Sequence, residues 1–223
     1  MSISAIRNSE RRPGPQYYAN VRHEMVGFLP PRYSRVLEVG CGEGVFAPLL
    51  TLPCEKWGVE MDPNSAQRAE MVMDRVLVGL YEDVSSQLPA HYFDLVVCND
   101  VIEHMADPEA FLAAVKGHMA PGACIMASIP NMRHWEVLWQ LLVKKDWKYV
   151  REGIMDRTHL RFFTETSIRR MFEEAGFDVD RAGGINGVFG PARRMAFVAL
   201  NALTFGSCRD IQFRQFAVLA RLR

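Results

Sequence analysis

Three glycines, Gly40, Gly42 and Gly44, alternate directly after the strand-like run 36–39. Glycine lets the backbone adopt φ values that other residues avoid, and it lets the chain approach a ligand closely. A second strand-like run, 56–60, ends at Glu60, about twenty residues after the first glycine. At this distance a parallel α/β unit presents a carboxylate that accepts hydrogen bonds from ribose hydroxyls. Together these features predict a nucleotide-cofactor loop; a tight strand-to-helix turn without a ligand is the alternative.

The glycine spacing bears on which cofactor binds. Dinucleotide loops follow the pattern GxGxxG, in which the third glycine allows close helix packing, and Val45 stands at that position here. Glu38 before the loop and Glu43 inside it would repel a pyrophosphate. The same carboxylates would attract a cofactor that carries an amino group and a sulfonium, so such a cofactor is expected.

The block from Glu38 to Gly44 resembles motif I of the class I S-adenosylmethionine-dependent methyltransferases. The resemblance implies that the glycine loop passes under the methionine part of the cofactor and that Glu60 binds the two ribose hydroxyls. It also implies that Asp83 accepts a hydrogen bond from the adenine amino group, although a solvated turn residue is the alternative. The residues expected to bind the cofactor are Glu38, Gly40, Cys41, Gly42, Gly44, Glu60, Met61, Asp83, Val84, Asn99, Asp100, Val101 and Tyr18.

Strand-like and helix-like patterns alternate from Arg35 onward. The expected strands are 35–39, 56–60, 75–80, 93–98, 123–129, 177–180 and 215–221, and the expected helices are 45–51, 64–73, 107–118 and 164–176. Asp62 and Asp107, each followed by a proline, are expected to cap helix starts. The alternation of strands and helices is typical of a parallel sheet with helices on both faces. The predicted fold class is therefore α/β, a Rossmann-like doubly wound sheet. The resemblance implies seven strands with the last one antiparallel.

We expect residues 1–34 to form an N-terminal lid and residues 35–223 to form the methyltransferase domain, with acceptor-side insertions at 130–163 and 183–206. A helical stretch from Tyr17 to Phe28 carries two tyrosines, which either close over the cofactor or pack on the sheet edge. The short apolar stretch Arg193–Leu200 is interpreted as a core or dimer helix, because it is too short and too weakly basic for an interfacial membrane helix.

Two histidines are candidates for a general base that deprotonates a hydroxyl acceptor. His159 is the first choice and His104 the second; for His104 a supporting hydrogen-bonding role is the alternative. The runs 128–135 and 156–164, with the aromatic insertion between them, resemble a subgroup of these methyltransferases associated with sugar, glycan and secondary-metabolite modification. In the alternative interpretation of 156–164, Asp156, Arg157 and Arg161 form a structural ion-pair network. Thr164 then caps a helix, and Phe162 and Phe163 are core residues.

Composition limits the possible partners. The 223 residues carry 26 basic and 26 acidic side chains, so no overall charge favours nucleic acid. No run resembles a signal peptide or a transmembrane span, so we expect a cytoplasmic protein. The five cysteines include no CxxC pair; they are expected to be reduced thiols, and no metal site is expected.

The sequence therefore predicts an S-adenosylmethionine-dependent methyltransferase for a small polar acceptor, first of all a sugar or glycoconjugate hydroxyl. The alternative acceptor is a secondary metabolite or quinone-type aromatic, N- or O-methylated, which an apolar pocket around Trp135, Trp139 and Trp147 would favour. A cofactor-binding module without turnover is a further alternative, and a homodimer is possible. A nicotinamide dehydrogenase is disfavoured by Val45 and Glu43.

Overall fold

The computed structural model describes residues 21–187 and 190–223, without the side chains of 191–193. The expected contact of Tyr18 with the cofactor therefore lies outside the described residues, as does Tyr17. The described residues form a sheet of seven strands in the order β3-β2-β1-β4-β5-β7-β6. These strands are β1 (Arg35–Val39), β2 (Glu55–Glu60), β3 (Arg75–Val78), β4 (Phe93–Asn99), β5 (Met119–Pro130), β6 (Phe177–Gly187) and β7 (Phe213–Leu222).

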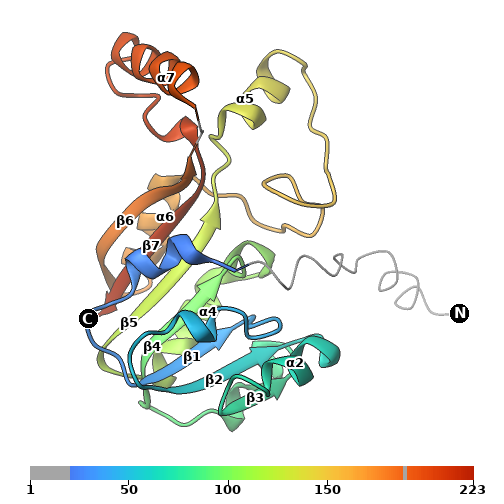
Figure 1. The fold of residues 1–223 in the computed structure, drawn as a ribbon, viewed down its shortest axis with the longest axis vertical. Helices are drawn as coiled ribbons and strands as arrows, with labels where there is room; N and C mark the ends of the chain where they lie inside the picture. Colours follow the sequence, from blue (N-terminus) through green and yellow to red (C-terminus); the bar gives the residue numbers. More distant parts are fainter. Residues whose placement is uncertain (1–20, 188–189) are drawn as a thin grey trace, which may run out of the picture.

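The direction of the strands follows the predicted pattern. β1 pairs in parallel with β2 and β4, and β5 pairs in parallel with β4. β7 is antiparallel to both of its neighbours, β5 and β6. The predicted Rossmann-like α/β fold, with its last strand antiparallel, is confirmed (Figure 1).

The predicted aspartate caps mark helix starts correctly. Asp62 accepts a hydrogen bond from the backbone N–H of Ser65, and Asp107 accepts one from that of Ala110, each at 2.9 Å. The α-helices among the described residues are α2 (Pro63–Ala69), α3 (Tyr81–Val84), α4 (Pro108–Val115), α5 (Trp135–Leu142), α6 (Glu165–Glu174) and α7 (Pro191–Leu203). Short 3₁₀ helices are η1 (His23–Phe28), η2 (Ala47–Leu49), η3 (Ser85–Gln87), η4 (Ile102–His104), η5 (Lys116–His118) and η6 (Asp210–Gln212).

The predicted helix over 45–51 is wrong, because the chain forms only η2 there. Pro48 stands inside the run and has no N–H to donate to a carbonyl four residues back. Proline also disfavours the helical conformation of the residue before it. The glycine loop is therefore followed by a tight turn, and α2 is the first α-helix of the described residues.

The sheet is covered by a hydrophobic layer on each face. Val96 of β4 lies in one layer with Leu112 of α4 and Phe172 of α6. Val97 lies in the other layer with Met25 of η1. Because neighbouring residues of a strand point to opposite faces, the continuous apolar run of β4 is buried on both sides.

The described part of the expected lid lies against the sheet. Met25 of η1 is fully buried. The guanidinium carbon of Arg181 in β6 lies over the ring of Phe28, 4.8 Å from the ring centroid. Arg22 donates a hydrogen bond to Gln215 of β7 at 3.0 Å. Residues 23–28 therefore form a fixed cover for the β6 and β7 side of the sheet (Figure 1).

Helices α5 and α7 project from one end of the sheet (Figure 1). A core position for α7, one of the two predicted options, is wrong because Met195 and Leu203 are 73% and 79% exposed. The first residues of the expected 183–206 insertion, 183–187, extend β6 instead. None of the helices in the described ranges is both long and apolar enough to cross a membrane.

The strand order reverses between β1 and β4. The strands that follow β1 in sequence, β2 and β3, lie on one side of it, whereas β4 and β5 lie on the other side. Ligands of open α/β sheets bind outside the carboxyl ends of the strands at such a switch point. Here the turn after β4 lies close to the glycine loop after β1. A Cβ atom built on Gly40 would lie 2.5 Å from Cγ2 of Val101, and Gly40 has a φ of +71°. Glycine is therefore required where the two loops meet.

We predict that Gly40→Ala lowers the free energy of unfolding by at least about 2 kcal/mol, because it combines a left-handed backbone with steric overlap. Gly117→Ala is the matched control, since nothing lies within 4 Å of its added Cβ and its φ is not left-handed. Urea denaturation of both variants measures the difference. Equal stabilities would show that the Gly40 turn adapts without cost.

Candidate active site

The glycine loop is held in a left-handed turn at the end of β1. Gly40, Gly42 and Gly44 have φ values of +71°, +55° and +73°. The backbone N–H groups of Gly40 and Cys41 both donate to the carbonyl of Val59, at 2.8 and 3.2 Å. The loop is therefore tied to β2, and its backbone faces the switch point.

The carboxylate of Glu60 is buried and joins two loops. One oxygen accepts a hydrogen bond from the N–H of Gly42 and the other from that of Asp62, each at 2.8 Å. Burial raises the pKa of Glu60, and these hydrogen bonds oppose the rise. Each carboxylate oxygen has a second lone pair, so Glu60 retains acceptor capacity for ribose hydroxyls.

Glu38 places a second buried carboxyl group beside the loop. It is 3% exposed, and its Oε2 has no hydrogen-bond partner among the described residues. Burial, with a smaller contribution from the charge of Glu60, raises the pKa of Glu38 to about 8. A buried acceptor without a partner is costly, and a cationic ligand group would supply one. The site therefore fits the cofactor with an ammonium and a sulfonium that the sequence predicts.

Asp100 holds the turn after β4 in place. Its φ of +53° is unusual for a residue with a side chain. Its Oδ1 accepts hydrogen bonds from Ser128 at 2.9 Å and Gln215 at 2.6 Å, and its carboxylate forms an ion pair with Arg22. Asp100 is thus engaged with β5, β7 and the segment before η1. These three partners were missed by sequence reasoning because they are distant along the chain.

The remaining predicted cofactor residues lie in β4, in α3 and in the loops after β1 and β2, in different environments. Met61 is 65% exposed and Asp83 is exposed, so both are open to solvent. Val84 is buried, and so is Cys41, whose Sγ lies close to Gly58 of β2. The side-chain oxygen and nitrogen of Asn99 are buried without a hydrogen-bond partner within 21–187 and 190–223.

The two predicted histidines lie together. The loop that carries His159 docks on η4, because the N–H groups of Leu160 and Arg161 both donate to the carbonyl of Glu103, at 2.8 and 3.0 Å. The ring centroids of His104 and His159 are 4.8 Å apart. The two candidate bases, which are far apart in the sequence, therefore lie side by side in the fold.

Both histidines are held in one tautomer by backbone carbonyls. Nδ1 of His159 lies 2.9 Å from the carbonyl of Ile154, and Nδ1 of His104 lies 3.2 Å from that of Thr158. A carbonyl only accepts, so each Nδ1 carries the proton and each Nε2 carries the lone pair. Burial lowers both pKa values, and the neighbouring His159 helps to bring the pKa of His104 to about 4. His104 is consequently a weak base at neutral pH.

Glu103 is a further residue of this region that sequence reasoning missed. It is 1% exposed, and neither carboxylate oxygen has a hydrogen-bond partner in the described part of the chain. Burial raises the pKa of Glu103 to about 8. Its Oε1 lies 4.0 Å from Nε2 of His159. The signal in the sequence was a carboxylate directly before a histidine, just after a strand end.

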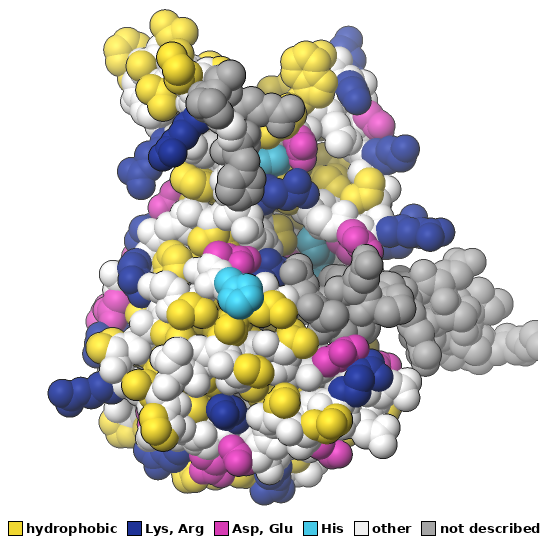
Figure 2. Space-filling view, in the orientation of Figure 1, with side chains coloured by type: hydrophobic (Ala, Val, Ile, Leu, Met, Phe, Trp, Pro, Cys, Tyr) yellow, Lys and Arg dark blue, Asp and Glu magenta, His cyan; other side chains and the backbone are white. Residues whose placement is uncertain are grey.

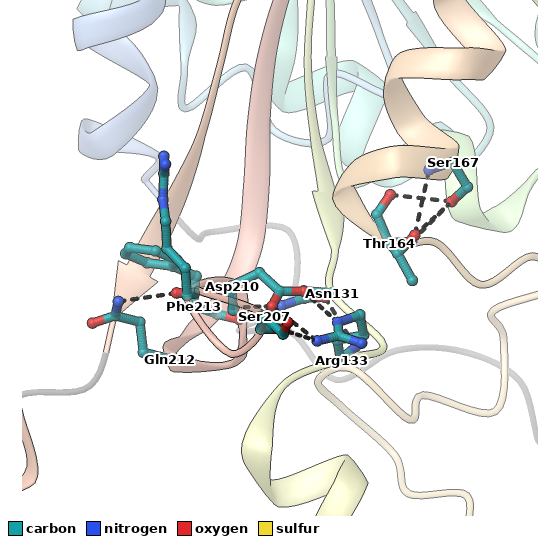
Figure 3. A network of polar contacts seen from close by, with 9 residues as sticks. Asn131, Arg133, Thr164, Ser167, Ser207, Asp210, Gln212 and Phe213 are labelled. Carbon is teal, nitrogen blue, oxygen red and sulfur yellow. Dashed lines mark hydrogen bonds and ion pairs between the residues drawn. The ribbon is translucent and has the colours of Figure 1, made fainter. Parts of the chain in front are cut away.

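The ion-pair network expected for 156–164 is not formed among the described residues. Asp156 instead accepts hydrogen bonds from the N–H and hydroxyl of Thr158, at 2.8 and 2.7 Å, and Arg161 donates to the carbonyl of Ala106. The cap at Thr164 is confirmed, because its side chain and that of Ser167 form a capping box (Figure 3). Phe163 is buried as predicted.

Phe162 is half-buried and contacts Trp147 instead of the core. Their ring centroids are 5.6 Å apart, and Trp147 is 41% exposed. Trp139 of α5 is 51% exposed. Figure 2 shows hydrophobic side chains gathered on the two projecting segments, α5 and α7. These projecting segments are therefore rich in exposed aromatic and aliphatic groups.

A polar network fixes the base of these projecting segments (Figure 3). Asn131, after β5, donates to the carbonyls of Asp210 and Phe213, both at 2.9 Å. Arg133 donates to the Asp210 carboxylate at 2.6 Å and to the carbonyl of Ser207 at 2.7 Å. The chain that leads to α5 is thereby joined to the chain that follows α7.

Comparison with known proteins adds to this geometry. A family model described as a methyltransferase domain matches residues 9–182. A ubiquinone biosynthesis O-methyltransferase of Cereibacter sphaeroides is 27% identical over 176 residues, which are 75% of this chain and 70% of the relative. One from Neisseria meningitidis is 28% identical over 169 residues, 71% of this chain and 70% of the relative.

Solved structures agree on the fold. A SAM-dependent methyltransferase from Archaeoglobus fulgidus superposes with a TM-score of 0.62 at 17% identity, covering 99% of this chain and 100% of that one. A Thermotoga maritima protein described as a possible histamine N-methyltransferase superposes with a TM-score of 0.61 at 18% identity. The match covers 90% of this chain and 87% of that one. At these identities the likeness concerns the fold alone.

We predict that, without ligands, the free energy of unfolding falls as pH rises from about 6.5 to 8. Glu38 and Glu103 have folded-state pKa values of about 8, above the roughly 4.3 of an unfolded glutamate. The folded state therefore binds more protons in this range, so stability is lost as pH rises. Below about 6.5 the lowered histidine pKa values act in the opposite direction.

Chemical denaturation across this pH range measures the effect. Glu38→Gln should give a shallower fall, whereas Glu174→Gln, which changes an exposed carboxyl on α6, should follow the unmodified protein. A slope that Glu38→Gln leaves unchanged would contradict the assigned role of Glu38.

Proposed function

Because the chain belongs to the methyltransferase domain family, we propose that it transfers the methyl group of S-adenosylmethionine to a hydroxyl oxygen of a quinone-type or related aromatic small molecule. The enzyme class and the cofactor follow from the family. The identity of the acceptor and the roles of individual residues are the proposal. Two observations support the proposal. The relatives are named as O-methyltransferases, and aromatic rings are exposed between β5 and α6.

The cofactor side is assigned to the groups at the switch point. S-adenosylmethionine, when bound, supplies a methyl group that is already activated by the positive sulfur. Glu60 accepts from the ribose hydroxyls, and the unpartnered oxygen of Glu38 offers an acceptor to the cationic methionine part. The glycine loop permits close approach because its backbone carries no Cβ. The role of these residues is to bind and orient, which supplies much of the rate in a displacement reaction.

The acceptor side is assigned to the segment between β5 and α6. Its exposed rings, Trp139, Trp147 and the half-buried Phe162, suit a flat apolar acceptor. The relatives described above are named as O-methyltransferases of ubiquinone biosynthesis. This supports the quinone-type alternative over the sugar or glycan hydroxyl that the sequence predicts first; neither relative is named for a sugar acceptor.

The chemistry requires an acceptor hydroxyl oriented in line with the methyl group and a route for its proton. His159 and His104 lie at the carboxyl end of β4, next to the turn that meets the glycine loop. A phenolic hydroxyl needs less help to ionise than a sugar hydroxyl, because its pKa is near 10. The weak basicity of these histidines therefore suits an aromatic acceptor better than a sugar.

An acceptor panel tests the proposal. The purified protein is incubated with methyl-labelled S-adenosylmethionine and, separately, with hydroxylated quinol precursors, simple catechols, nucleotide sugars and glycan fragments. We predict label in the phenolic acceptors, as methyl ethers. Label confined to sugars would overturn the acceptor assignment, and S-adenosylmethionine that binds without turnover on any acceptor would support the non-catalytic module. Glu60→Ala protein is the control that ties turnover to this cofactor site.

A further inference from the structure

We propose that the exposed face of α7 binds α7 of a second copy of this chain, antiparallel to it, so that the protein forms a two-fold symmetric dimer. The helix projects from one end of the sheet (Figure 1). Met195, Val198 and Leu203 are 73%, 65% and 79% exposed. Single exposed apolar residues are ordinary, but several together on one helix mark an interaction site. The dimer is independent of the proposed function, and its test requires no methyl transfer.

The apolar residues of α7 are spaced to form one stripe. Met195, Val198, Ala199 and Ala202 stand at positions i, i+3, i+4 and i+7, which lie on the same side of an α-helix. Together with Arg194 they line one hollow on the surface of the helix. Two of the four are alanines, so another backbone can approach closely, because the distance between packed helices depends on the side chains at the contact. A stripe of this kind fits a second helix.

The stripe is complementary to itself when its direction is reversed. If a two-fold axis passes between Val198 and Ala199, Met195 of one copy lies opposite Ala202 of the other. The same axis places Val198 opposite Ala199. Each large side chain then meets a small one, as close packing of facing positions requires. A two-fold interface needs this property, because both copies use the same surface.

A parallel pair of the same helices would lack this match. Met195 would face Met195, and Ala202 would face Ala202 of the second copy. Large side chains would then overlap at one end of the contact, and a cavity would remain at the other end. The order of large and small residues therefore favours the antiparallel pair.

The charge on α7 favours the same direction. The N–H of Arg194 closes the first turn of the helix by donating to the carbonyl of Gly190 at 3.0 Å. A cation is unfavourable at this end, because the helix dipole is positive there. The last turn contains no basic residue. In the antiparallel pair, Arg194 of each copy lies beside the last turn of the other, where the dipole is negative. A charge that is unfavourable in one chain thus becomes favourable twice in the dimer.

The composition of α7 argues against a lipid surface as the occupant. A helix that lies in a membrane interface combines its apolar face with a strongly charged face rich in lysine and arginine. Arg194 is the only charged residue between positions 194 and 203. A second copy of the helix requires no such charged face.

Sedimentation velocity of the full chain over a concentration series measures the association. We expect the mass to rise from that of one chain toward that of two. Val198→Glu should weaken the dimer by at least about 100-fold, because it brings two carboxylates into an apolar contact beside the axis. Glutamate is a good helix former, so α7 should stay helical in this variant. Circular dichroism checks that it does.

Met71→Glu is the matched control. Met71 follows α2, far from α7 (Figure 1), and is 84% exposed. The variant adds the same charge at an exposed apolar residue and should dimerise as the unmodified chain does. A mixture of Val198→Glu and Val198→Lys chains should recover the dimer that each variant loses alone, since opposite charges then lie beside the axis.

Arg194→Glu tests the direction of the pair. The substitution favours the helix of a single chain, because an anion suits its N-terminal end. It also places that anion beside the negative end of the second copy. We expect the dimer to weaken by at least about tenfold. Equal affinity in this variant would overturn the antiparallel arrangement.

Three further results would overturn the proposal. The first is the mass of one chain at every concentration up to about 1 mM. The second is a dimer that Val198→Glu leaves unchanged. The third is a chain that stays monomeric but sediments with vesicles of phosphatidylcholine and phosphatidylglycerol, and that loses this binding in Val198→Glu. This last result would assign the face of α7 to a lipid surface.

Discussion

The double hydrogen bond of Glu60 is the interaction on which the site depends. By accepting from Gly42 and Asp62 at 2.8 Å each, it joins the loop after β1 to the turn that starts α2. The glycine loop then meets the turn after β4, where Gly40 leaves room for Val101. The two loops at the switch point thus approach each other at a distance that a larger side chain at position 40 would prevent.

Buried carboxyl groups at the carboxyl ends of the strands connect this geometry to function. Glu38 and Glu103 are both nearly inaccessible, and both have raised pKa values of about 8. Such groups reduce the stability of the free protein at neutral pH and above. A ligand that brings positive charge recovers this energy on binding. For Glu38 the proposed charge is the cationic methionine part of the cofactor.

The fold was largely predictable because its signals are local. Apolar runs such as 93–98 and the caps at Asp62 and Asp107 act over a few residues, and they were identified correctly. The cofactor loop was predictable for the same reason. The wrong helix at 45–51 came from discounting Pro48, whose effect is also local. The orientation of the last strand followed from the resemblance and not from the spacing.

The acceptor side was less predictable because it depends on contacts between distant segments. The loop of Leu160 and Arg161 donates to the backbone carbonyl of Glu103, and no periodicity in the sequence predicts that docking. Arg161, one of the arginines of the expected ion-pair network, donates instead to the carbonyl of Ala106.

The central claim, that Glu60 and the glycine loop hold S-adenosylmethionine, is tested most directly by calorimetric titration of the cofactor into Glu60→Ala protein. The comparison is with Glu70→Ala, which removes an exposed carboxylate at the end of α2. The account predicts that Glu60→Ala weakens binding by about 1 to 3 kcal/mol, while Glu70→Ala leaves it unchanged. Equal affinity of a folded Glu60→Ala protein and the unmodified chain would contradict it.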